Sequence, residues 1–163
     1  MASLLIVYHS MTGGSRQMAQ AAAAGAGAAG NVAIRIMQAA DATAADVLAA
    51  DGYLFATPEN LASMSGQMKD FFDRTYYAAL ERLNGRPYAV MICAGSDGSL
   101  AAAQLERIAT GWRLKAIAPA LIVCTHAQTP EAIRKPKHIP AAQLQQCRDL
   151  GATLAEGLSL GIF

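Results

Sequence analysis

Five short apolar segments alternate along this chain with segments of helical periodicity, and this alternation constrains the fold more than any other feature. Four of them are nearly continuous apolar runs, which is typical of strands in a parallel sheet covered on both faces. Arg35 interrupts the other one, which therefore suits a sheet edge. The five segments are SLLIVY (3–8), VAIRIM (32–37), GYLFAT (52–57), PYAVMIC (87–93) and APALIVCT (118–125). This order predicts right-handed crossovers and one doubly wound α/β domain over residues 1–163.

Helical patterns fill the gaps between these segments. The longest helix is expected from about Ser65 to Leu83, with Asn84 and Gly85 as its stop. An alanine-rich helix is expected to begin near Gly14, and DATAADVLAA (41–50) predicts a short one. Two later helices are indicated by apolar residues at helical spacing, which are Leu105, Ile108 and Trp112 in one and Cys147, Leu150, Leu154 and Leu158 in the other.

The composition excludes several classes of function. Thirteen Lys and Arg against twelve Asp and Glu give a net charge of +1, which offers no electrostatic footprint for nucleic acid or an anionic membrane. No apolar run approaches the roughly 20 residues of a membrane span, and we expect a cytoplasmic protein. Cys93, Cys124 and Cys147 lack metal-ligand spacing, so we expect buried, reduced thiols and no metal site.

The stretch GAGAAG (25–30) matches the glycine pattern of dinucleotide-binding loops letter for letter. That pattern has meaning only after a strand and at the start of a helix. Here it ends an alanine-rich helix and leads into a strand. Small residues for close packing of the helix on the sheet, followed by a glycine stop, are the expected explanation.

The first loop, Ser10–Ser15, has the opposite context, because it follows a strand and opens a helix. Unpaired N–H groups and the positive end of the helix dipole suit a phosphate there, and Ser10, Thr12 and Ser15 add hydroxyl donors. No lysine follows as in the loops that hold nucleoside triphosphates with magnesium. A plain turn with a serine helix cap is the alternative, and the stretch alone does not choose between them.

Three stretches together resemble the flavodoxin superfamily. The pattern Ser10-x-Thr12-Gly13-x-Ser15 resembles its phosphate loop. The stretch TPENLASMSGQMKDFFDRT (57–75) is similar to the second flavin loop and following helix of tryptophan-repressor-binding-protein-like NAD(P)H:quinone oxidoreductases, and to the T-P-E loop of NADPH-dependent FMN reductases. AGSDGS (94–99) lies where the superfamily has its third flavin loop. Such a sheet binds ligands beyond the carboxyl ends of its strands.

This resemblance implies a flavodoxin-like three-layer sandwich with a five-stranded parallel sheet in the order 2-1-3-4-5, and FMN as cofactor. The first loop would wrap the phosphate, while the second and third loops would hold the ring. The implied site residues are Ser10, Met11, Thr12, Gly13, Gly14 and Ser15 in the first loop, Pro58, Glu59, Asn60, Leu61, Ala62, Ser63 and Met64 in the second, and Ala94, Gly95, Ser96, Asp97 and Gly98 in the third. Glu59 or Asp97 could bond a ribityl hydroxyl or the N3–H of the ring, although an exposed loop acid is the commoner outcome.

The departures from the family patterns favour an enzyme. Quinone reductases often have an aromatic residue near Leu61, Gly at Ala62 and Asn at Ser63, and carrier flavodoxins commonly stack aromatics on the ring. Neither ring-binding loop contains an aromatic residue here, so one ring face stays open for a nicotinamide or a quinone unless a neighbouring subunit covers it. We expect an NAD(P)H-dependent reductase of quinones or related acceptors, with ping-pong hydride transfer, in a homo-oligomer (dimer or tetramer). The alternatives are a non-enzymatic electron-transfer flavodoxin and a flavin-free interaction module.

No catalytic side chain is identified in the sequence. His126, at the end of the fifth strand, is the best of three weak histidine candidates, the others being His9 and His138. The cationic stretch from His126 to Pro140 is expected to be a surface excursion, that is, a solvated loop outside the core. The alternative is that its cations bind the 2′-phosphate of NADPH, since arginine and lysine recognise phosphate well.

Overall fold

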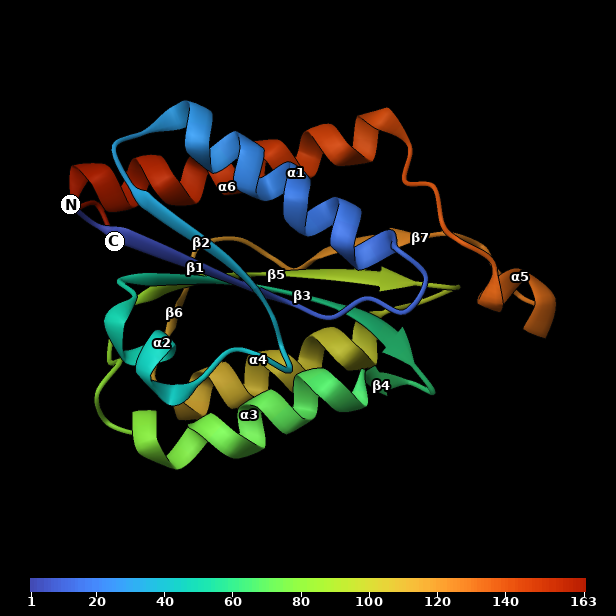
Figure 1. Ribbon diagram of the computed structural model, residues 1–163, viewed down its shortest axis with the longest axis horizontal. Helices are drawn as coiled ribbons and strands as arrows, with labels where there is room; N and C mark the ends of the chain where they lie inside the picture. The colour runs from blue at the N-terminus through green and yellow to red at the C-terminus, as the bar shows by residue number, and fades with distance from the viewer.

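The computed structural model describes residues 1–163 as one twisted sheet with helices on both faces (Figure 1). The parallel strands are β1 (Ser3–Tyr8), β2 (Ala33–Gln38), β3 (Gly52–Asn60), β5 (Pro87–Ala94), β6 (Lys115–Ala116) and β7 (Leu121–Cys124), and a two-residue strand β4 (Ser63–Met64) pairs antiparallel with the end of β3. The order is β2-β1-β3-β5, followed by β6 and β7, which both pair with β5. The predicted order 2-1-3-4-5 is confirmed, with β2 at the edge.

The predicted fifth strand, 118–125, is wrong at its amino end. Residues 118–120 lie in no strand, and the strand beside β5 is in two pieces: β6, which pairs with the start of β5 and precedes residue 118, and β7, which pairs with the end of β5. Pro119 lies in the interruption and has no N–H to donate to a ladder,. Only the second piece reaches the carboxyl edge of the sheet.

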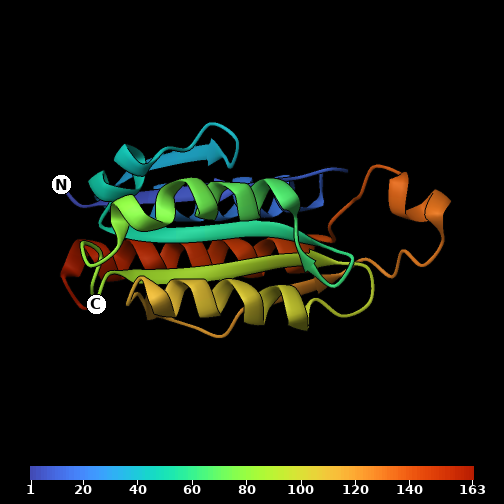
Figure 2. The ribbon, with the colours of Figure 1, turned by 90° about the horizontal axis from the view of Figure 1, so that it is seen from below.

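Helices α1 (Gly14–Ala29) and α6 (Ala141–Leu160) cover one face, while α2 (Ala44–Ala49), α3 (Gly66–Ala79) and α4 (Ser99–Gly111) cover the other (Figures 1 and 2). A short helix, α5 (Pro130–Arg134), stands apart beyond the carboxyl ends of the strands. The predicted extension of α3 to Leu83 is wrong. Leu80 caps the helix, and Glu81 has a φ of 64°, in the left-handed region that ends a helix,.

The two faces of the sheet have different cores. The face under α3 and α4 buries aromatic rings, with Phe55 of β3 packed on Phe71 and Phe72 of α3, and Phe72 packed in turn on Trp112. The face under α1 and α6 is filled mainly by alanine, methionine and aliphatic residues. Small side chains let α1 and α6 lie close to the sheet and to each other.

Gly25 shows the purpose of the GAGAAG stretch. A Cβ on Gly25 would lie 2.0 Å from the backbone oxygen of Arg148 in α6. Gly25 itself therefore serves a close contact between two helices, while its neighbour Ala26 is buried in the core between α1 and the sheet, as predicted. Gly30 caps α1 as predicted, in an extended conformation with φ −168°.

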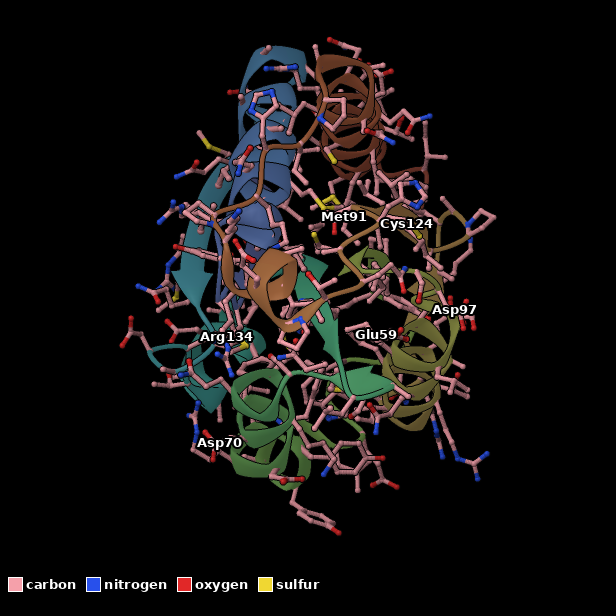
Figure 3. All side chains as sticks on the ribbon, turned by 90° about the vertical axis from the view of Figure 1, so that its right-hand side faces the viewer. Glu59, Asp70, Met91, Asp97, Cys124 and Arg134 are labelled. Carbon is pink, nitrogen blue, oxygen red and sulfur yellow. The ribbon has the colours of Figure 1, made fainter.

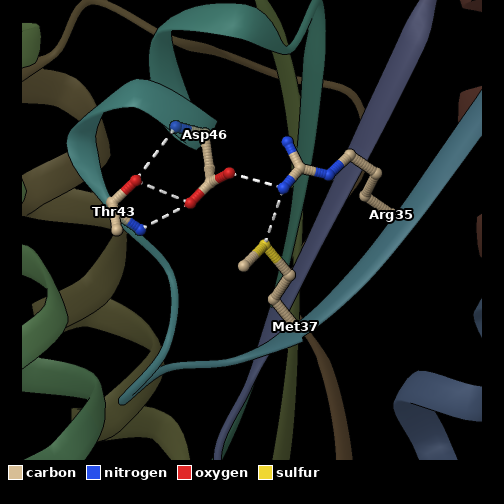
Figure 4. Close-up of polar contacts among 4 residues, drawn as sticks. All are labelled: Arg35, Met37, Thr43 and Asp46. Atoms are coloured by element: carbon tan, nitrogen blue, oxygen red, sulfur yellow. Dashed lines mark hydrogen bonds and ion pairs between the residues drawn. The ribbon is translucent and has the colours of Figure 1, made fainter.

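The edge strand β2 is tied to α2 by polar contacts (Figure 4). Arg35 pairs with Asp46, whose carboxylate also accepts the N–H of Thr43 at 2.8 Å and its hydroxyl at 2.7 Å. Burial opposes ionisation of Asp46, but these hydrogen bonds from Thr43 and Arg35 hold its pKa below the ordinary value. The capping box at Thr43 stabilises the start of this short helix, which covers residues 44–49 of the predicted segment 41–50,.

Candidate functional site

The first loop joins β1 to α1 through two glycines that cannot be replaced without strain. Gly13 is the N-cap of α1 with a φ of 93°, in the left-handed region that favours glycine,. A Cβ on Gly14 would lie 2.5 Å from the Sγ of Cys93. No side chain caps α1, and Ser10 Oγ instead accepts the N–H of Gly13 at 3.0 Å. The alternative of a serine-capped helix is therefore wrong, and the first-turn N–H groups stay available to a ligand.

The donors at the start of α1 fit a phosphate group. The hydroxyl oxygen of Ser15 is buried and has no hydrogen-bond partner within the chain, so a polar ligand would satisfy it. A cavity of about 330 Å³ is lined by Ser10, Thr12, Gly13 and two arginines, Arg16 and Arg134. No carboxylate lines this cavity. Free N–H groups and positive charge without acidic neighbours are the chemistry that an anion requires.

The second loop is a tight hairpin between β3 and β4. Asn60 pairs with Ser63, and the two residues between them have positive φ, 52° at Leu61 and 61° at Ala62. These angles are those of a type I′ turn, for which Asn-Gly is preferred and leucine and alanine are strained. The side-chain oxygen of Gln104 in α4 holds the hairpin, because it accepts the Ser63 hydroxyl at 2.9 Å and the Met64 N–H at 3.0 Å.

The acids of the second and third loops bind the backbone of α4. Glu59 accepts the N–H of Gly98 at 2.9 Å and that of Ala101 at 3.2 Å. Asp97 is exposed and accepts the hydroxyl of Ser99 at 2.7 Å. Gly98, the N-cap of α4, has a φ of 88° and no side-chain cap of its own. Glu59 thus supplies the missing cap from a distance, a role that the sequence did not indicate.

Polar contacts also join the first loop to the second. The ring nitrogen Nδ1 of His9 lies 2.7 Å from the hydroxyl of Ser65, which in turn accepts the N–H of Met68 at the start of α3. The side-chain amide of Asn60 donates to the sulfur of Met11 at 3.1 Å. Burial lowers the pKa of His9 below its ordinary value of 6.5, so this histidine is neutral at pH 7.

The segment 126–140 connects the third loop to the first at the carboxyl edge of the sheet (Figure 3). At its start, the His126 N–H donates to Gly95 of the third loop at 2.8 Å. Near its end, the Lys137 N–H donates to Thr12 of the first loop, also at 2.8 Å. Figure 3 looks onto this edge, with α5, which ends at Arg134, in front and Glu59 to its right. The surface excursion is therefore anchored to the loops at both ends.

The three predicted loops meet at one edge of the sheet, but they do not contribute equally to the cavity. Ser10, Met11, Thr12 and Gly13 line it, whereas no residue of the second or third loop does. The side chain of Leu61 is fully exposed at the hairpin tip. His126 is exposed and has a φ of 58°.

The cysteines lie close to this edge without forming a reactive or metal-binding group. Cys93 and Cys147 are buried as predicted, and burial raises the pKa of each thiol to about 11. Cys124 is only half-buried, which corrects the expectation that all three are buried. No three His, Cys, Asp or Glu side chains come together as a metal site. No helix is both long and apolar enough to cross a bilayer.

Arg134, Gln17 and Gln104 are site residues that sequence reasoning missed or left open. Each acts across a large distance in the chain. Gln17 bonds residues 137 and 139, and Gln104 bonds residues 63 and 64. A polar residue within an amphipathic helix carries no local signal of such a contact.

The strand order and the glycine-capped first loop at the carboxyl edge of the sheet define a flavodoxin-like domain. Solved structures with the same fold include a flavodoxin from the domain Archaea, with a TM-score of 0.77, 21% identity and coverage of 96% of this chain and 98% of that one. A WrbA-like flavodoxin from Agrobacterium tumefaciens has a TM-score of 0.70 and 20% identity over 95% of this chain and 96% of that one. These likenesses confirm the predicted fold class.

The chain belongs to the NADPH-dependent FMN reductase family, whose sequence model matches residues 35–128. The predicted resemblance is confirmed, and FMN is the cofactor that the family assigns. A flavodoxin of Aquifex aeolicus is 37% identical over 73 residues, which are 45% of this chain and 40% of the relative. A protein from Chelativorans named NAD(P)H dehydrogenase (quinone) is 33% identical over 131 residues, 64% of this chain and 65% of the relative. The chain thus spans less than two thirds of either relative.

Proposed function

We propose that residues 1–163 form one FMN-binding domain that oxidises NAD(P)H and reduces a quinone or a related small acceptor. The observation that carries this proposal is the carboxylate-free cavity at the start of α1, lined by Ser10, Thr12, Gly13 and two arginines, in a member of the FMN reductase family. The quinone-reductase names of relatives point to the same class of acceptor.

The chain's own residues would bind and orient the cofactor. When bound, FMN supplies the hydride-accepting and electron-donating chemistry. The first-turn N–H groups of α1 and the Ser15 hydroxyl would hold the phosphate, as the first loop of the sequence predicts. Backbone groups of the second and third loops would meet the ring, and contacts from Gln104 and Glu59 would keep these loops in place.

An open ring face favours an enzyme over an electron carrier. No aromatic residue occurs between Pro58 and Met64 or between Ala94 and Gly98, so neither loop stacks a side-chain ring on the cofactor. A nicotinamide and an acceptor would occupy that space in turn. The balanced reaction transfers one hydride from NAD(P)H and takes up one proton, giving NAD(P)⁺ and the hydroquinone.

Kinetics test this scheme directly. Initial rates over a grid of NAD(P)H and quinone concentrations should give parallel double-reciprocal lines, because the oxidised nicotinamide leaves before the acceptor enters. Intersecting lines would contradict the shared face. FMN binding without turnover of any quinone would leave an electron-transfer flavodoxin, and a protein whose spectrum shows no bound FMN would be a flavin-free module.

The same edge suggests an oligomer of at least two subunits. Four exposed apolar side chains come from four different segments there, which are Met11 of the first loop, Leu61 of the second, Leu100 of α4 and Ile133 of α5. Exposed apolar groups around a binding site are typical of protein interaction surfaces. A neighbouring subunit could cover the ring with residues that this chain lacks. Light scattering that shows an active monomer would refute this.

A further inference from the structure

The segment 126–140 is fixed firmly to the first loop. Besides the Lys137–Thr12 backbone bond, the Gln17 side chain donates to the carbonyls of Gly13 at 2.9 Å and Lys137 at 2.7 Å, and accepts the N–H of Ile139 at 3.1 Å. Ile139 is fully buried. The position of this segment relative to the start of α1 is therefore set by the fold.

The three cations of this segment have different environments. The ammonium of Lys137 donates to the carbonyls of Ala132, Ile133 and Lys135 at the end of α5. Lys135 pairs with Glu131 at 3.0 Å. Arg134 has neither an ion pair nor a hydrogen bond within the chain, and it lines the cavity of the first loop together with Ser10 and Thr12. Arg134 is thus the cation that remains for a ligand.

We propose that Arg134 binds the phosphate of FMN, as a charged ligand added to the neutral donors of the first loop. A guanidinium presents a planar set of donors that matches phosphate oxygens. Arg16, on the first turn of α1, lines the same cavity and reinforces the positive charge. This inference rests on the proposed FMN binding, and it gives the excursion a role in the cofactor site.

The 2′-phosphate of NADPH is the competing source of the same chemistry. The cavity favours FMN, because Arg134 shares its lining with Ser10, Thr12 and Gly13 of the loop that leads into the free N–H groups of α1. One phosphate would then contact the loop and the arginine together. A 2′-phosphate bound there would displace the cofactor from its own loop.

The test measures dissociation constants of FMN and of riboflavin, which lacks the phosphate, by quenching of flavin fluorescence. Arg134→Gln should raise the dissociation constant of FMN about tenfold or more, since a charge-assisted contact to the phosphate is lost. The dissociation constant of riboflavin should change by less than about twofold. Arg134→Lys should retain part of the affinity, because it keeps the charge without the planar donor set. Arg82→Gln, which removes an exposed arginine just beyond the end of α3, is the matched control and should bind FMN like the parent.

Several results would overturn the assignment. Arg134→Gln binding FMN within about twofold of Arg82→Gln would do so, as would an equal loss of FMN and riboflavin, which would indicate a structural role. A raised KM for NADPH but not for NADH, with FMN affinity unchanged, would assign Arg134 to the 2′-phosphate instead. A parent protein that binds no FMN would refute the proposed function itself, a result distinct from a failure of Arg134 alone.

Discussion

Replacing Glu59 by alanine should destabilise the protein through α4, although Glu59 lies on β3. Its carboxylate is the acceptor for two N–H groups at the start of α4, those of Gly98 and Ala101. Loss of a helix cap costs about 1 kcal/mol, and loss of a negative charge at a helix N-terminus costs about 0.3–1 kcal/mol more. We expect Glu59→Ala to lower the free energy of unfolding by about 2 kcal/mol.

Urea unfolding of the apoprotein measures this change without interference from the cofactor. The melting temperature should fall in parallel by about 4–8 °C, since a chain of this size loses about 2–4 °C per kcal/mol. Glu59→Gln keeps an acceptor but not the charge, so it should lose about half as much. Glu156→Ala, at an exposed position of α6, is the control and should change stability by less than about 0.5 kcal/mol,.

The result also decides between two roles for this residue. If Glu59→Ala is as stable as Glu156→Ala but binds FMN much more weakly, the capping argument is refuted. Glu59 would then be a direct ligand of the ribityl chain or the ring, as the family resemblance implies. A loss of stability in the apoprotein cannot come from a cofactor contact, so the two roles are separable.

Three further changes test other parts of the structure. Gly25→Ala should lower the free energy of unfolding by about 1–3 kcal/mol, measured by thermal unfolding, because the added Cβ would clash with the backbone of α6,. Gly27→Ala, whose Cβ would meet only Ile34 at 3.7 Å, should raise the free energy of unfolding by about 0.5–1 kcal/mol,. Equal effects of the two substitutions would refute the close helix contact. Ala62→Gly should raise the free energy of unfolding by up to about 1 kcal/mol, because glycine relieves the strain of the left-handed backbone in the second loop,. Ala103→Gly in α4 should lower the free energy of unfolding by about as much. Destabilisation by both substitutions would contradict the type I′ turn. Because the pKa of His9 is lowered in the folded protein, the unfolded chain binds this proton first as the pH falls, so stability should be retained above about pH 6.5 and decrease below it,. His9→Gln should reduce the difference between the urea midpoints measured at about pH 7.5 and about pH 5.5. An unchanged difference would assign the pH dependence to other groups.

Much of the fold could be predicted because its signals are local. The apolar runs and their spacing predicted the strands and the doubly wound α/β class, the family resemblance implied the strand order, and Arg35 marked the edge strand correctly. The first loop could be predicted from the glycine and hydroxyl residues between a strand and a helix. The end of α3 was mispredicted because Glu81 adopts a left-handed conformation that glutamate rarely takes, so Asn84 and Gly85 looked like the stop,.

The parts of the site that escaped prediction depend on contacts between distant segments. Glu59 caps a helix that begins 40 residues later in the chain, at Ser99. Arg134 reaches the first loop only because Gln17 and Lys137 fix the excursion beside it. No local pattern distinguishes these residues from solvated ones, since their partners are set by the tertiary fold. Pro119 was a local indication that no strand continues through residues 117–120, but the apolar residues around it favoured one uninterrupted strand,.

The central claim is that NAD(P)H delivers hydride to a flavin held at the carboxyl edge of the sheet. The most direct test is an anaerobic titration of the FMN-loaded protein with NADPH or NADH, followed through the visible flavin absorbance. We expect one equivalent of reduced nicotinamide to bleach the bound flavin, and a subsequent equivalent of quinone to restore the oxidised spectrum. A flavin that stays bound and oxidised in the presence of excess NADPH and NADH would contradict the account.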